Sequence, residues 1–296
     1  MRIFDCFMYF DEEIVLDTRL NYLDKYVDYF VIIESCFTHR GEERKLNFDI
    51  KKYEKFKNKI IYKVYDQIPE KIEKVFENDN EAIKSGKYIM NALYRENGQR
   101  NYISEGIKEA NDEDIIIVSD VDEIPNLSKI ALKELKEKII LFKQDMFYYK
   151  FNLKLPNMEW TGTKACKKKN FINAQWLRNI KDRKYPFYRL DVLFSKSKYI
   201  DVKIVKDGGW HFSNIKNAKE IKYKLKSYLH HREFDLDPLD EEGIKKIMEN
   251  KQAIYDLRVD KTVNKIGTGD KLEKYNVENL PEEIKLNLNK YKEWLD

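Results

Sequence analysis

Cysteine, glycine and proline are all scarce in this 296-residue sequence, with 3, 10 and 6 occurrences. Cys6, Cys36 and Cys166 are too few and too scattered for a disulfide framework or a zinc site, so we expect free thiols in a reducing compartment. The low glycine and proline content also argues against a long disordered tail. Because 42% of the residues are hydrophobic and 14% aromatic, the chain has ample material for a globular core.

Long hydrophobic runs and an excess of one charge are missing as well. No apolar run approaches the roughly 18 residues of a membrane span. The first residues turn acidic at Asp11, before an apolar stretch of signal-peptide length is reached, so we expect a soluble, cytoplasmic protein. Lysine and arginine total 56 against 52 aspartates and glutamates, a net charge of +4. Both signs are interspersed, which argues against a nucleic-acid partner.

Short apolar segments alternate with helical patterns in the first 120 residues. We predict strands at Ile3–Phe10, Tyr29–Ile33, Ile60–Tyr65 and Ile115–Val118, with a helix from Ile14 to Val27 after the first. Strands of this kind, separated by helices, form a parallel sheet that is covered on both faces. The expected fold is therefore a doubly wound α/β domain, with the IIIV strand next to the first strand.

The rest of the chain is less regular. We predict helices around Ile103–Ala110 and Ile130–Phe142, then β-like sequence from Met146 to Val205. From Asn217 onward the pattern is helical, and Asn217 with Glu220 forms a capping box. We therefore expect two parts, a mostly parallel α/β domain over residues 1–215 and a helical appendage over residues 216–296 that packs on it.

Open α/β sheets bind ligands at the carboxyl ends of their strands, and here those ends are acidic, at Asp11, Glu12, Glu34 and the segment 120–123. In VSDVDEIP, Asp120 and Asp122 are two residues apart, so in an extended segment both carboxylates point the same way. Together they would bind a hard cation such as Mg²⁺ or Mn²⁺, with phosphate oxygens and water completing its shell. The alternative is that these acids cap a helix or are solvated on a loop.

A second unusual segment is GGWHFS, Gly208–Ser213. Glycines permit close backbone approach, and the neutral imidazole of His211 is a good ligand for a divalent first-row metal ion. His211 would be a ligand if it meets Asp122 in space, and otherwise a hydrogen-bonded core residue. Of the remaining histidines, His39 has a weaker context, and we expect His230 and His231 on a solvated helix face.

Several segments together resemble glycosyltransferase family 17, the family of the β-1,4-N-acetylglucosaminyltransferase that adds bisecting N-acetylglucosamine. The matching segments are FDCFMYFDEEIVLDTRL (4–20), VDYFVIIESCFTHRG (27–41), DIIIVSDVDEIP (114–125) and GGWHFS (208–213), in family order. The resemblance implies a GT-A-type fold and an inverting transfer of N-acetylglucosamine, or a related sugar, from a UDP-sugar to a hydroxyl of a saccharide or glycoconjugate.

The resemblance also implies roles for particular residues. Asp120 and Asp122 fall on the D-x-D motif that binds the ribose and the metal diphosphate, and His211 falls on the metal-binding histidine near the carboxyl end of the domain. Glu34 would read the uridine. Arg95 and Arg100, near the helix before the D-x-D strand, would reach the nucleotide, or else form surface ion pairs.

An inverting transferase also needs a carboxylate that deprotonates the acceptor hydroxyl. Glu123, Glu159, Asp191 and Asp207 are possible by position. We favour Glu123 because it adjoins the metal pair, although it could instead anchor the turn before Pro125 through backbone N–H groups.

Two other functions compete with a transferase. The DVDEI segment could be the nucleophile loop of a haloacid-dehalogenase-like phosphatase, but that loop normally follows the first strand. The 20 tyrosines, 16 phenylalanines and 4 tryptophans could stack on sugars in a non-catalytic saccharide- or nucleotide-binding protein.

Overall fold

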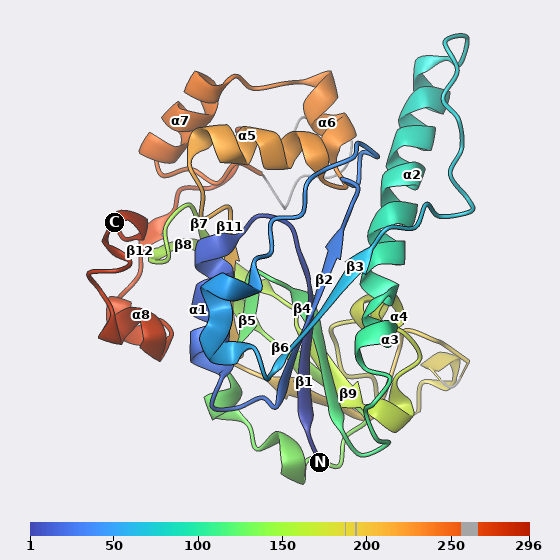
Figure 1. Ribbon diagram of the computed structural model, residues 1–296, viewed down its shortest axis with the longest axis vertical. Coiled ribbons are helices and arrows are strands. Elements are labelled where there is room, and N and C mark those ends of the chain that lie inside the picture. Colours follow the sequence, from blue (N-terminus) through green and yellow to red (C-terminus); the bar gives the residue numbers. More distant parts are fainter. Residues whose placement is uncertain (187, 193, 256–265) are drawn as a thin grey trace.

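The computed structural model describes residues 1–186, 188–192, 194–255 and 266–296, which form an α/β fold with two sheets (Figure 1). Within these ranges the larger sheet has seven strands in the order β10-β6-β9-β4-β1-β2-β3. Its strands are β1 (Ile3–Tyr9), β2 (Tyr29–Ser35), β3 (Ile60–Tyr65), β4 (Ile115–Asp120), β6 (Ile139–Phe142), β9 (Lys164–Lys167) and β10 (Val202–Val205).

The half of this sheet formed by β3, β2, β1 and β4 is parallel throughout, which confirms the four predicted strands. β4 pairs directly with β1, so the IIIV strand is the neighbour of the first strand, as predicted. On the other side β9 runs antiparallel to both β4 and β6. Because β1, β2 and β4 are buried on both faces, their sequences are mostly apolar.

Helices cover both faces of the larger sheet. They are α1 (Glu13–Leu23), α2 (Glu81–Asn101), α3 (Ile103–Gly106) and α4 (Ala174–Asn179). α1 buries Val15, Leu16 and Leu20 and confirms the first predicted helix. The prediction around Ile103–Ala110 is wrong in extent, because the long helix α2 starts at its N-cap Asn80 and α3 ends at Gly106. Ile103 and Ile107 still pack into the core.

The smaller sheet has the order β12-β8-β7-β11-β5. Its strands are β5 (Glu123–Pro125), β7 (Gln144–Tyr148), β8 (Leu153–Trp160), β11 (Gly209–Ser213) and β12 (Glu273–Lys274). The helix predicted over Ile130–Phe142 is wrong. That segment contains one 3-10 turn and then β6, whose four buried residues lie between β9 and β10, so the IILF run belongs to a strand buried on both faces.

The chain after Asn217 starts as predicted. The helices are α5 (Ala218–Ser227), α6 (His231–Leu236), α7 (Glu241–Glu249) and α8 (Glu282–Leu286). The Asn217–Glu220 capping box is present, and Figure 1 shows α5 and α6 above the carboxyl ends of the parallel strands. The prediction of helix throughout is wrong further on, because β12 joins the smaller sheet and Tyr291 is buried in the main core. His231 is also buried, contrary to the solvated position expected for it, whereas His230 is half exposed.

Short 3-10 turns complete the described elements, at Ile50–Phe56, Leu127–Lys129, Leu132–Glu134, Lys168–Asn170, Leu190–Val192, Val277–Asn279 and Lys292–Trp294. Across the described ranges, no helix has both the length and the apolar character that crossing a membrane would require.

Candidate active site

A cavity of about 650 Å³ lies at the carboxyl edge of the parallel strands, lined in part by α5 and the residues that follow it. Of the predicted site residues, Arg100, Asp120, Asp122 and His211 line this cavity, whereas Glu34, Arg95 and Glu123 do not. The residues that line it range from Met8 in β1 to Tyr255 in the C-terminal third. The cavity therefore unites motifs that are far apart in the sequence.

Asp122 and His211 meet because β5 and β11 form an antiparallel pair in which His211 lies opposite Glu123. The backbone N–H of Phe212 donates to the carbonyl of Asp122 at 2.7 Å, which fixes the position of β11 relative to the turn that carries Asp122. Gly209, at φ +135°, lies where a Cβ would be 2.1 Å from the carbonyl oxygen of Ile124. Glycine is therefore required for this close approach, as the GGWHFS segment predicted.

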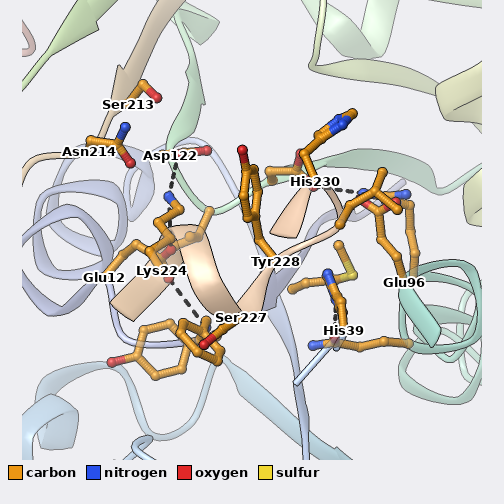
Figure 2. Close-up of a pocket in the computed structure, with 18 of the residues that line it drawn as sticks. Glu12, His39, Glu96, Asp122, Ser213, Asn214, Lys224, Ser227, Tyr228 and His230 are labelled. Carbon is orange, nitrogen blue, oxygen red and sulfur yellow. Dashed lines mark hydrogen bonds and ion pairs between the residues drawn. The ribbon is translucent and has the colours of Figure 1, made fainter. Parts of the chain in front are cut away.

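The resulting contact places Nε2 of His211 3.6 Å from Oδ1 of Asp122, inside the cavity. Lys224 of α5 approaches from the other side, with its Nζ 3.5 Å from Oδ2 of Asp122 and 3.3 Å from Oε1 of Glu12 (Figure 2). Burial alone would raise the pKa of Asp122, but Lys224 and His211 hold it well below its usual value. Burial would lower the pKa of His211, yet the Asp122 carboxylate outweighs burial and raises it.

The Asp122–His211 pair suits a divalent cation that is shared with a substrate. Two ligands of one octahedral ion, each about 2.1 Å away, lie about 3 Å apart, and the pair is close to that spacing. The second imidazole nitrogen, Nδ1 of His211, is buried and has no hydrogen-bond partner among the described residues. In the same ranges no group of three or more His, Cys, Asp or Glu side chains could hold an ion, so phosphate oxygens and water would have to complete its shell.

Asp120 does not join this pair, which corrects the predicted three-ligand site. Val121 and Asp122 form a turn after β4, so the alternation of an extended strand does not apply to them. The Asp120 carboxylate instead forms ion pairs with two arginines, with Nη2 of Arg100 at 3.2 Å and with Nη2 of Arg178 at 2.9 Å. Burial would raise its pKa, but the two guanidinium groups lower it, so Asp120 remains ionised at the cavity wall.

Arg178, on α4, is a site residue that sequence reasoning missed. Its guanidinium lines the cavity and bridges Asp120 to Glu123, with Nη1 2.5 Å from Oε2 of Glu123. Nothing near position 178 distinguishes this arginine from a surface residue of a short helix. Its role depends on the packing of α4 beside β4, which only the tertiary structure reveals.

Glu123 does not fit the predicted role of catalytic base. Its side chain is fully buried and accepts from the backbone N–H of Asp120 at 2.9 Å and from Nε1 of Trp160 at 2.6 Å, besides Arg178. A Cβ at Gly162 would lie 1.8 Å from this carboxylate, so the chain is shaped around it. Glu123 therefore anchors the turn, which was the alternative role. The other predicted bases, Glu159, Asp191 and Asp207, do not line the cavity either.

Glu34 is equally committed to the fold. Its buried carboxylate accepts from Nη2 of Arg44 at 2.9 Å, from the backbone N–H groups of Asn47 and Phe48, and from the Tyr62 hydroxyl. The predicted contact with uridine is therefore not supported, because Glu34 is fully buried and does not line the cavity. Its ion-pair partner Arg44 does line the cavity.

We expect the Glu34→Gln substitution to lower the free energy of unfolding by about 2 kcal/mol, because a buried charged acceptor loses its ion pair. The KM and kcat for a donor substrate should stay close to those of the wild type. Thermal unfolding and steady-state kinetics on one preparation measure both. A raised KM at unchanged stability would instead indicate that Glu34 contacts the uridine directly.

Arg95 also differs from its prediction. Its guanidinium donates to the carbonyls of His39 and Arg40, both at 3.2 Å, and lies against Gly41. Arg95 therefore holds the turn after β2 and does not reach the cavity. Arg100, one helical turn further, does line it and meets Glu96 at 2.8 Å.

The turn that Arg95 holds forms one end of the cavity. His39 lies 3.1 Å from Oε1 of Gln99, whose amide donates to the carbonyl of Ile33. Burial lowers the pKa of His39, which favours a neutral imidazole. With Phe37 and Thr38 beside them, these groups offer an uncharged surface of rings and hydrogen-bonding atoms.

Beneath the site lies a second group that the sequence did not reveal. Arg19 of α1 and Asp5 of β1 are fully buried and form a two-pronged ion pair, Nη2–Oδ1 at 2.6 Å and Nε–Oδ2 at 2.8 Å. Arg19 also donates to the carbonyls of Asp120, Val121 and Glu123. Arg19 is therefore the buried support of the turn that carries Asp122.

Comparison with known proteins gives the family. Residues 1–295 match Glycosyltransferase family 17, so the match spans nearly the whole chain. Comparison with curated proteins finds no match. The family match agrees with the resemblance of the four sequence segments and sets aside both the phosphatase and the non-catalytic binding protein. The chain belongs to glycosyltransferase family 17 and is a glycosyltransferase.

Proposed function

We propose that this enzyme transfers N-acetylglucosamine, or a related sugar, from a UDP-sugar to a saccharide hydroxyl, with inversion and with a divalent cation, Mn²⁺ or Mg²⁺. The observation that carries the proposal is the Asp122–His211 pair, 3.6 Å apart inside a cavity at the carboxyl edge of a parallel sheet. A carboxylate and an imidazole suit such an ion. When bound, the ion would neutralise charge on the departing diphosphate.

The cavity also has room and chemistry for the rest of the donor. The end beside His39 and Gln99 suits a nucleobase, because it offers rings and hydrogen-bonding groups. Asp120 would accept from ribose hydroxyls, as the D-x-D motif of the family implies. Arg100, Arg178 and Lys224 also line the cavity and would supply positive charge for a diphosphate.

In the proposed reaction, the acceptor oxygen attacks the anomeric carbon and the bond from that carbon to the diphosphate oxygen breaks. The hydroxyl proton passes to a carboxylate of the protein. Among the residues that the structure describes, five carboxylates line the cavity: Glu12, Glu96, Asp120, Asp122 and Glu233. Since Asp120 and Asp122 are assigned to the nucleotide and the cation, Glu12, Glu96 and Glu233 are our candidates for the base.

We expect that one of the variants Glu12→Gln, Glu96→Gln and Glu233→Gln loses at least about 100-fold in kcat, because an amide cannot accept the proton. The affinity of that variant for UDP should be unchanged. Glu123→Gln serves as a comparison, because its effect should fall on stability. If all three variants kept their kcat, the base would lie elsewhere.

The direct test is a panel of UDP- and GDP-sugars, each with and without Mn²⁺, read by thermal shift and by slow hydrolysis of the donor. The proposal requires a shift that depends on both Mn²⁺ and the UDP group. A shift with GDP-sugars alone, or one indifferent to the metal ion, would contradict it.

The metal ion should bind more tightly as the pH rises. The cation needs neutral His211, and Asp122 raises the pKa of that imidazole above its model-compound value of 6.5, so protons compete with the ion around neutral pH. We expect the Mn²⁺ dissociation constant in the presence of UDP, measured by electron paramagnetic resonance, to fall between about pH 6 and about pH 8. The variant His211→Gln should bind weakly with little pH dependence. A pH-independent constant in the wild type would argue against His211 as a ligand.

A further inference from the structure

Buried polar atoms without a partner gather at the cavity. In the described ranges, five such atoms belong to residues that line it: Arg100 Nε, Thr161 Oγ1, His211 Nδ1, Tyr228 Oη and Tyr255 Oη. A buried donor or acceptor left unpaired costs about 1–3 kcal/mol, so folded proteins seldom retain several in one place. Their concentration here indicates that a polar ligand supplies the missing hydrogen bonds.

Two of these atoms are tyrosine hydroxyls from the C-terminal third. Tyr228 follows α5, and its ring centroid lies 6.4 Å from that of Tyr255. A third tyrosine, Tyr148 at the end of β7, is nearly fully buried and pairs with Ser213 of β11, two residues after His211. All three tyrosines line the cavity. Figure 2 shows Tyr228 beside the Asp122–Lys224 pair.

We propose that Tyr148, Tyr228 and Tyr255, here called the tyrosine wall, bind the sugar ring of the nucleotide sugar. This inference rests on the proposed function. Tyrosine combines an apolar ring face with a hydroxyl that both donates and accepts, which matches the C–H faces and hydroxyl groups of a pyranose. The wall carries no charge, unlike the arginines and Lys224 that suit a diphosphate.

The position of the tyrosine wall indicates that it contacts the sugar of the donor and not that of the acceptor. The transferred sugar is bonded directly to the diphosphate, so it must lie next to the cation at Asp122 and His211. Tyr148 pairs with Ser213 on β11, the strand that carries His211 and whose Phe212 N–H donates to the carbonyl of Asp122. The C-terminal third, through Tyr228 and Tyr255, thereby takes part in the choice of sugar.

The test compares the affinities for UDP and for UDP-N-acetylglucosamine, both with Mn²⁺, by isothermal titration calorimetry. In Tyr228→Phe and Tyr255→Phe we expect the UDP-sugar to bind about three- to tenfold more weakly, since one hydrogen bond is lost, while the affinity for UDP stays within about twofold. Neither variant should lower the melting temperature, because each hydroxyl is unpaired in the free protein. Tyr149→Phe is the matched control, since its buried hydroxyl already donates to the carbonyl of Gln252 at 2.9 Å and it does not line the cavity.

The outcomes separate the two proposals. If wild-type protein bound neither UDP nor the UDP-sugar, the proposed function would fail and the inference with it. If both bound, but neither tyrosine variant changed the ratio of their affinities, the inference alone would be overturned. A parallel loss of UDP and UDP-sugar affinity would also overturn it, because the wall would then act on the nucleotide.

Discussion

We expect the Arg19→Met substitution to lower the free energy of unfolding by about 3–5 kcal/mol. The substitution leaves the Asp5 carboxylate buried without its ion-pair partner, and both side chains are fully buried in the native protein. It also removes the donor to three carbonyls of the turn around Asp122. Urea unfolding measures the loss, and protein that remains folded should bind Mn²⁺ and UDP more weakly.

Two further variants make this result interpretable. Lys25→Met removes an ion pair with Glu282 in which both side chains are about half exposed, so stability should hardly change. The double variant Asp5→Asn with Arg19→Met removes both buried charges and should recover part of the loss. If Arg19→Met alone were as stable as Lys25→Met, the support assigned to Arg19 would be wrong.

The second large effect is expected for Asp122→Asn, which should abolish Mn²⁺-dependent binding of the UDP-sugar and reduce turnover by at least about 100-fold. An amide cannot supply the negative charge that a hard cation requires. Loss of the carboxylate also leaves Lys224 with Glu12 alone. Calorimetry of UDP with and without Mn²⁺ measures the binding.

Asp182→Asn is the control for this variant, because its carboxylate is more than half exposed and pairs with Lys143 away from the cavity. It should bind and turn over the donor like the wild type. Unchanged metal dependence in Asp122→Asn would exclude Asp122 as a ligand, and the proposed chemistry would need another site.

The sequence predicted the parts of the fold that are governed by continuous apolar patterns. β1, β2 and β4 are short buried runs, and parallel strands of this kind have few alternatives. The segment from Ile130 to Phe142 was misread because a few apolar residues fit a helix and a strand equally well, and the pairing of β6 with β9 and β10 decided the outcome.

The sequence predicts the site less completely than the fold, because a carboxylate at a strand end can point either into the protein core or into the cavity. Asp122 points to the cavity, whereas Glu123 and Glu34 turn inward to arginines and backbone N–H groups. The sequence does contain one signal of the buried ion pair between Asp5 and Arg19. Asp5 interrupts an otherwise apolar strand, and a buried acid requires a cation such as Arg19.

The pairing of β1 with β4 also has a consequence for how the chain folds. Ile3 lies opposite Ile115, so the first strand acquires its second neighbour only after more than a hundred residues have followed it. Contacts of such long sequence separation slow folding, because the entropy of closing a large loop must be overcome first. During synthesis β1 and β2 can pair early, but the inner edge of β1 stays open until β4 leaves the ribosome, and this interval is when the nascent chain is most exposed to aggregation.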